Sequence, residues 1–177
     1  MPDSHGLAPD TGRALPTQTA RRATPADIPS LVRLVNAAYR VEDFFVDGDR
    51  TNAADIETRM ASSTAAFLVI AGQRDGELRG SVYVDVRGDR GYFGMLAVDP
   101  ARQKEGLGRA LVLAAEAHCR AAGCRFLDLD VVNLRQELPA FYRNLGYAPF
   151  ATAPFPKGEK LRREAHLVLM TKPLVEL

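Results

Sequence analysis

The spacing of apolar residues changes several times along the chain, and each spacing predicts a different element. Between residues 28 and 39, apolar side chains recur every three or four positions, which predicts an amphipathic helix. Thr24, Pro25 and Asp27 stand just before it, and these residue types favour the start of a helix. A weaker helical pattern covers residues 53–61. The acidic segment VEDFFVDGD between the two helices has no regular period.

The remaining pattern predicts a meander, a helix, a strand, a second helix and a hairpin. Short apolar runs bounded by turn residues are typical of strands, whereas the longer three-and-four spacing after Pro100 is typical of a helix. Pro139 suits a helix start, so the last helix is expected to begin just before Tyr142. This order favours an α+β fold around a mixed sheet. The segments are strands at 67–71, 78–86 and 92–98, a helix at about 107–122, the strand FLDLDVV, a short helix near 140–145 and two closing strands.

Length and composition indicate one globular domain with a loose start. A chain of 177 residues with 46% hydrophobic and 25% charged residues can bury one sizeable core. Residues 1–19 are polar and rich in proline and glycine, so we expect a flexible tail before a domain at 20–177. Neither the tail nor any later run approaches about 18 apolar residues, which favours a soluble, cytoplasmic protein without a membrane partner.

Charge and cysteine content narrow the classes of partner. A net charge of +1 gives no broad positive field, so a nucleic-acid partner is not expected. Cys119 and Cys124 have no further cysteine or histidine at metal-ligand spacing, which argues against a zinc site and for a reduced, intracellular chain.

The stretch ARQKEGLGRA at residues 101–110 has the composition of an anion-binding loop. Two glycines leave the backbone N–H groups open just before a helix, whose dipole favours a negative charge. The P-loop pattern fails because Gly108 is followed by arginine and alanine, and the dinucleotide fingerprint fails because Leu111 stands where its third glycine is needed. A pyrophosphate clamp and a simple flexible turn both remain open. Glu105 is expected to point to solvent and to pair with Arg102 or Arg109.

Several motifs together resemble the GNAT superfamily of acyl-CoA-dependent N-acetyltransferases. They are Val98-Asp99-Pro100, the run from Gln103 to Gly108, and FYRNLGY at residues 141–147. The resemblance covers the chain from about residue 20 onward. It implies a mostly antiparallel sheet with helices on both faces and central strands that splay to form an acyl-CoA cleft.

The resemblance also implies where the cosubstrate acetyl-CoA binds. The family's pantetheine arm pairs with open backbone on the central strand, here Leu96, Ala97 and Val98, and a backbone N–H there would stabilise the oxyanion. Many members carry an asparagine seven residues before the catalytic tyrosine. This chain has Arg135 at that position, so Asn133, two residues earlier, is the available candidate. The pyrophosphate would be held by Gln103, Lys104, Glu105, Gly106, Leu107, Gly108 and Arg109.

Tyr142 matches the family's general acid. The leaving thiolate has a conjugate acid with a pKa of about 8.5, so a phenol at about 10 that is hydrogen-bonded to the sulfur can donate a proton as charge develops. Some members place a glutamate base on the central strand, but residues 92–98 contain no carboxylate. A water relay is one alternative. The carboxylates that remain as candidate bases are Glu42, Asp43, Asp47, Asp85, Asp128 and Asp130.

These observations predict an N-acetyltransferase that moves an acetyl group from acetyl-CoA to a primary amine of a small molecule or peptide. In this fold the acceptor lies under two loops, here the acidic VEDFFVDGD and the basic PKGEKLRRE, so an amine that also carries a carboxylate or phosphate is one hypothesis. A homodimer is possible. Two alternatives are a non-catalytic acyl-CoA-binding or regulatory module of the same fold, and another type of nucleotide-binding protein.

Overall fold

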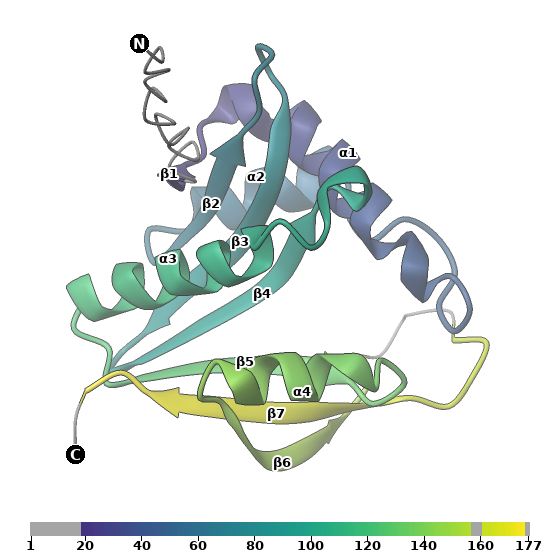
Figure 1. Ribbon diagram of the computed structural model, residues 1–177, viewed down its shortest axis with the longest axis vertical. Coiled ribbons are helices and arrows are strands. Elements are labelled where there is room, and N and C mark those ends of the chain that lie inside the picture. The colour runs from purple at the N-terminus through teal and green to yellow at the C-terminus, as the bar shows by residue number, and fades with distance from the viewer. Residues whose placement is uncertain (1–18, 157–160, 176–177) are drawn as a thin grey trace, which may run out of the picture.

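The computed structural model describes residues 19–156 and 161–175, which form one seven-stranded sheet with helices on both faces (Figure 1). The strand order is β1-β2-β3-β4-β5-β7-β6, and β4–β5 is the parallel pair. The strands are β1 (Arg21–Arg22), β2 (Ala65–Ala71), β3 (Leu78–Arg87), β4 (Arg90–Val98), β5 (Phe126–Val132), β6 (Ala148–Pro154) and β7 (His166–Pro173). The α-helices are α1 (Ile28–Tyr39), α2 (Ala53–Ala61), α3 (Leu107–Ala121) and α4 (Glu137–Asn144), and the 3-10 turns are η1 (Pro25–Asp27), η2 (Arg40–Glu42) and η3 (Pro100–Arg102).

The predicted α+β class and order of elements are confirmed, with two corrections. The sequence pattern missed β1, because two residues are too short to show a period. It also placed the start of α4 too late: the helix begins at Glu137, and Pro139 is its third residue. Proline fits there because the N–H groups of a first helical turn have no partner within the helix. The predicted tail lies outside the described residues except for Thr19.

Two apolar cores lie on opposite faces of the sheet. Helix α3 presents Leu111, Ala115 and Cys119 at helical spacing to one face, while α1 and α2 cover the other face. Strand β2 is buried on both sides, which explains why its sequence reads as a continuous apolar run. None of the described helices is both long enough and apolar enough to cross a membrane.

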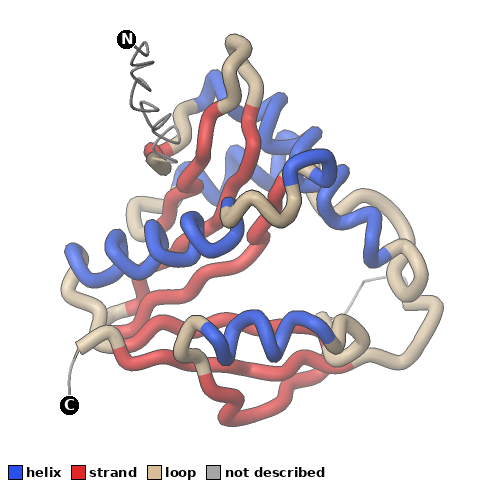
Figure 2. The backbone as a smooth tube through the Cα atoms, viewed as in Figure 1, coloured by secondary structure: helices blue, strands red, loops and turns tan. Residues whose placement is uncertain are grey.

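Strands β4 and β5 pair only at one end and then diverge, as Figures 1 and 2 show. Parallel pairing joins residues 90–92 to residues 126–128 and stops there. Arg90 fastens this closed end through two hydrogen bonds of 2.7 and 2.6 Å to the Asp128 carboxylate. Beyond Tyr92 the facing edges of the two strands have no strand partner within the described residues. The predicted splay is therefore present.

A β-bulge in β4 accompanies the divergence. Ser81 pairs with Ala97 but Tyr83 pairs with Gly94, so β4 holds one extra residue in this interval. Met95 takes a left-handed φ of 49°, which is unusual for a residue with a side chain. The extra residue shifts the alternation: Phe93 and Leu96, three positions apart, contact the α3-side core, while Met95 lies in the α1-side core.

Glu116 of α3 is a buried charge that connects this helix to β7 and to the turn before β6. Its side chain is 2% exposed and accepts hydrogen bonds from Tyr147 (3.1 Å), Lys172 (2.7 Å) and Arg120 (3.2 Å). A buried carboxylate with several donors is tolerated, whereas removal of one partner leaves the other charges without compensation.

We therefore expect Glu116→Ala to lower the free energy of unfolding by about 3 kcal/mol. The measurement is urea denaturation followed by circular dichroism. Glu57→Ala is the matched control, because Glu57 is exposed on α2 and its loss should change stability by no more than about 0.5 kcal/mol. Equal effects of the two substitutions would contradict a stabilising role for the buried cluster.

Candidate active site

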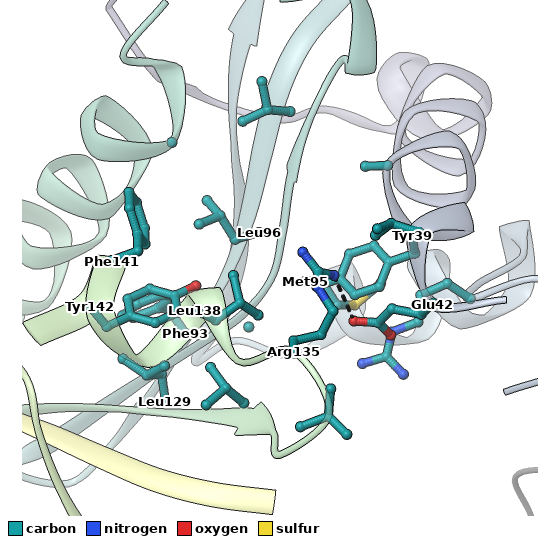
Figure 3. A pocket seen from close by; sticks show the side chains of 18 of the residues that line it. Tyr39, Glu42, Phe93, Met95, Leu96, Leu129, Arg135, Leu138, Phe141 and Tyr142 are labelled. Atoms are coloured by element: carbon teal, nitrogen blue, oxygen red, sulfur yellow. Dashed lines mark hydrogen bonds and ion pairs between the residues drawn. The ribbon is translucent and has the colours of Figure 1, made fainter. Parts of the chain in front are cut away.

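A cavity of about 1130 Å³ occupies the gap between the diverging strands. Its walls come from both faces of the sheet: Leu96, Leu107 and Tyr142 line it on the α3 side, and Tyr39 and Tyr83 line it on the α1 side. The gap thus joins two compartments, which we name the loop half and the acceptor half. The loop half lies at the start of α3, and the acceptor half lies at the end of α1. Figure 3 shows Tyr142 and Tyr39 on opposite sides of this space.

The loop half is formed by the predicted anion loop. Two left-handed residues, Lys104 with φ of 69° and Gly106 with φ of 79°, turn the chain into α3. The first N–H groups of a helix have no partner within it. Among the described residues, the N–H groups of Leu107 and Gly108 have no protein acceptor. The loop residues that line the cavity are Gln103, Lys104, Gly106, Leu107, Gly108 and Arg109.

Gly108 is not required by the packing of the protein itself. A Cβ atom built there would stand 3.6 Å from Phe141 and 3.9 Å from Val98, which are ordinary contact distances. The missing side chain therefore leaves space at the mouth of the loop half, next to exposed donors. This space fits a ligand group that approaches the backbone closely, such as a pyrophosphate.

Glu105 has a partner that the sequence analysis did not anticipate. The guanidinium of Arg79 on β3 donates to the Glu105 carboxylate at 2.6 Å, and Arg102 lies 3.6 Å from Glu77. The side chain of Arg79 is 15% exposed and reaches the loop from the neighbouring strand. A contact across 26 residues of chain has no sequence spacing that would reveal it.

Tyr142 lies in an aromatic cluster on the α3 side of the cavity. Its ring centroid is 5.9 Å from Phe93, 5.0 Å from Phe141 and 6.1 Å from Tyr147. Burial raises the pKa of its hydroxyl well above the ordinary value. The hydroxyl has no hydrogen-bond partner in the described part of the chain, and Figure 3 shows it pointing into the cavity.

The acceptor half holds two carboxylates, the buried Glu42 and the half-buried Asp130. Asp130 of β5 accepts a hydrogen bond of 3.2 Å from the Tyr92 hydroxyl, across the gap between the strands. Glu42 of η2 accepts one of 3.2 Å from Arg135 (Figure 3). Desolvation raises the pKa of both carboxyl groups, because burial penalises the charged form.

The other four candidate bases do not line the cavity. Each has a partner elsewhere: Asp43 with Arg40, Asp47 with Arg162, Asp85 with Thr64 and Arg87, and Asp128 with Arg90. Among the described residues, no group of three or more histidine, cysteine or acidic side chains is placed to hold a metal ion.

Three predicted cosubstrate residues do not line the cavity. The amide oxygen of Asn133 accepts the His166 N–H at 2.8 Å, so this side chain connects two strand ends. Ala97 is buried in the α1-side core, and Glu105 pairs with Arg79. The structure instead places Arg135 in the cavity wall.

Several aromatic and basic side chains of the acceptor half were not predicted from the sequence. Tyr39 ends an amphipathic helix and Tyr92 begins a strand, positions that are compatible with ordinary core packing. The hydroxyl group of a tyrosine on an otherwise apolar helix or strand face was the available indication that these residues could line a site. The lining residues of this kind are Tyr39, Arg50, Arg59, Tyr83, Tyr92 and Arg135.

The two charged loops contact each other. An isolated β-bridge joins Val46 to Leu161, and the Arg162 N–H donates to the Phe45 carbonyl at 2.7 Å. The Arg162 side chain also pairs with Asp47. Of the basic residues in the second loop, Lys157 and Lys160 lie outside the described residues.

Comparisons with known proteins agree with this architecture. A relative, the aminoglycoside N(6')-acetyltransferase type 1 of Stenotrophomonas maltophilia, is 34% identical over 121 residues, which cover 63% of this chain and 74% of the relative. A mycothiol acetyltransferase of Nocardiopsis dassonvillei is 39% identical over 82 residues, and one of Propionibacterium freudenreichii is 31% identical over 106 residues. The matches cover only 22% and 34% of the length of these two enzymes.

Solved structures of low identity share the fold. The ribosomal-protein-S18-alanine N-acetyltransferase of Escherichia coli has a TM-score of 0.73 at 18% identity, with 90% of this chain and 95% of that one covered. A phosphinothricin acetyltransferase of Sinorhizobium meliloti, solved in complex with AcCoA, has a TM-score of 0.70 at 19% identity, with 88% and 87% covered.

The family model described as "Acetyltransferase (GNAT) family" matches residues 29–147. This match spans the first helix, the diverging strands, the glycine loop and the tyrosine of α4. The chain therefore belongs to the GNAT family.

Proposed function

We propose that this enzyme transfers an acetyl group from acetyl-CoA to a primary amine of a small molecule, by direct attack of the amine. One observation carries the proposal: the cavity between the diverging strands is lined by the start of α3 and Tyr142 on one side and by the carboxylates of Glu42 and Asp130 on the other. Such a space lets two substrates meet from opposite sides. The β-bridge between Val46 and Leu161 supports a small acceptor, because it joins the two charged loops to each other.

Bound acetyl-CoA would supply an activated thioester. The N–H groups from Gln103 to Arg109 would bind its pyrophosphate, and Lys104 and Arg109 would add positive charge. The open edge of β4 at Leu96, Ala97 and Val98 would pair with the pantetheine arm. A backbone N–H at Leu96 or Ala97 would stabilise the negative charge that develops on the carbonyl oxygen, an effect commonly worth about 3 kcal/mol.

We expect Gly108→Ala to separate ligand binding from folding. Alanine is a better helix former than glycine by up to about 1 kcal/mol and meets no close contact here, so the melting temperature should stay equal or rise. The added methyl group should weaken acetyl-CoA binding about tenfold or more, because it fills the space next to the N–H groups. Calorimetric titration and thermal denaturation test both points. Unchanged affinity would place the pyrophosphate elsewhere.

Tyr142 is proposed as the general acid. Burial raises the pKa of its phenol, which keeps the proton in place at neutral pH. Transfer from such a phenol to a thiolate in water would be uphill. The same apolar surroundings also raise the pKa of a thiol, as burial does for Cys119 in this protein, to about 12. A thiolate that forms beside Tyr142 is therefore basic enough to take the proton.

We expect Tyr142→Phe to lower kcat about 10²-fold while the KM for acetyl-CoA changes less than about threefold. Release of free thiol measures both parameters. Tyr147→Phe is the matched control from the same aromatic cluster: it removes a hydrogen bond to Glu116 and should affect stability rather than kcat. A wild-type kcat in Tyr142→Phe would refute the acid role.

Asp130 is proposed as the group that accepts the proton of the acceptor amine, directly or through a water. Glu42 is the weaker candidate because its carboxylate is already engaged by Arg135. Asp130 accepts a neutral hydrogen bond from Tyr92 and lines the cavity. Its raised pKa makes it a stronger base than an exposed aspartate.

The pH dependence of kcat/KM tests this role. Because a base must be deprotonated, kcat/KM should rise with pH through the pKa of Asp130, which lies above the ordinary value of about 4. We expect Asp130→Asn to lower kcat/KM about 10²-fold at pH 7 and to remove this acid limb. The control is Asp128→Asn on the same strand, which should retain the limb because Asp128 is outside the cavity. An unchanged profile in Asp130→Asn would favour Glu42 or water.

A further inference from the structure

Three tyrosines around the acceptor half each carry an arginine on the face of the ring. Flat stacking on an aromatic ring holds a guanidinium in place and leaves its N–H donors pointing outward in its own plane. The pairs, with the distance from guanidinium carbon to ring centroid, are Arg50 on Tyr39 at 5.1 Å, Arg59 on Tyr83 at 5.1 Å and Arg87 on Tyr92 at 4.6 Å.

Two of these arginines, Arg50 and Arg59, line the cavity. Asp55 accepts the Nε–H of Arg59 at 3.0 Å, so this contact engages one edge of the guanidinium. Arg50 lies close enough to Asp130 to act on its carboxyl group electrostatically. Arginine presents paired donors that match a carboxylate or a phosphate. The acceptor half therefore offers cationic donors near the proposed base.

The acidic groups of the same wall differ in whether a cation already binds them. Arg135 binds two of them, Glu42 at 3.2 Å and Glu137 at 2.6 Å. Asp130 has a neutral phenol as its hydrogen-bond partner. The wall thus suits one ammonium or amine group at Asp130, whereas an acceptor with several ammonium groups would meet Arg50 and Arg59.

We infer that the acceptor is a small amine that also carries an anionic group, a carboxylate or a phosphonate. Arg50 and Arg59 bind the anion, and Asp130 receives the amine. This inference rests on the proposed acetyl transfer and adds the substrate class. It also moves the anion site from the basic loop of residues 156–164, suggested by the sequence, to the arginines stacked on the tyrosines of α1 and β3.

Matched acceptor pairs test the inference with the wild-type enzyme. The carboxylate arm compares α-amino acids with their carboxamides, and the phosphonate arm compares aminoalkylphosphonates with alkylamines of equal length. An aminoglycoside represents polycationic amines. In at least one arm, we expect kcat/KM from thiol release to be about tenfold or more higher for the anionic member than for its neutral counterpart.

Substitutions locate the anion site. For the preferred anionic amine, Arg50→Gln and Arg59→Gln should each raise KM about ten- to a hundredfold and leave kcat within about threefold, because the reacting atoms are untouched. The KM of the neutral counterpart should stay nearly constant. Arg33→Gln on α1 is the matched control outside the cavity. Arg50→Lys should raise the KM of the anionic amine less than Arg50→Gln does. A rise in melting temperature with acetyl-CoA verifies that each variant is folded. The comparison of anionic and neutral amines with the wild-type enzyme does not depend on any variant.

The outcomes distinguish a failure of the acceptor class from a failure of the proposed acetyl transfer. Faster turnover of the neutral or polycationic amines would overturn the acceptor class and leave the proposed acetyl transfer intact. An equal rise in KM for anionic and neutral amines in Arg50→Gln would show a structural role and would also overturn the class. Absence of thiol release with every amine tested would overturn both the class and the proposed function.

Discussion

The short pairing of β4 with β5 is the constraint on which the site depends. A sheet with a continuous ladder at its centre would have no room for substrates, because side chains from both faces would close over it. Here the ladder ends at Tyr92, and the two strands diverge beyond it. The same divergence leaves backbone donors and acceptors open on both strand edges. The cavity and its hydrogen-bonding capacity therefore have one origin.

Burial of polar groups then sets the chemistry of the cavity. Desolvation raises the pKa of Tyr142 and of Asp130, which favours the protonated form in each case. In the proposed mechanism, this effect gives an acid that stays protonated at Tyr142 and a base of increased strength at Asp130. The loop half would bind its ligand by a different principle, through N–H groups that the helix geometry leaves without partners.

Much of this arrangement was predictable from the sequence, and the misses have a common physical cause. Period and turn residues revealed the meander and α3, and local motifs revealed the glycine loop and Tyr142. The pairs Arg79–Glu105, Tyr92–Asp130 and Arg135–Glu42 are separated by 26, 38 and 93 positions. No local pattern encodes such contacts. The bulge at Met95 was equally hidden, because it depends on the register with β3. Asn133 was assigned by position alone, although its amide closes a strand end.

The clamp between Arg90 and Asp128 has a mechanical consequence. The two strands pair with each other only at this contact and in the few residues next to it. The angle between them at this point therefore determines how far apart Leu96 and Val132 lie. A small change of this angle produces a larger change in the width of the cavity between the strands. The width of the cavity therefore depends partly on side chains outside it, at the paired ends of the two strands.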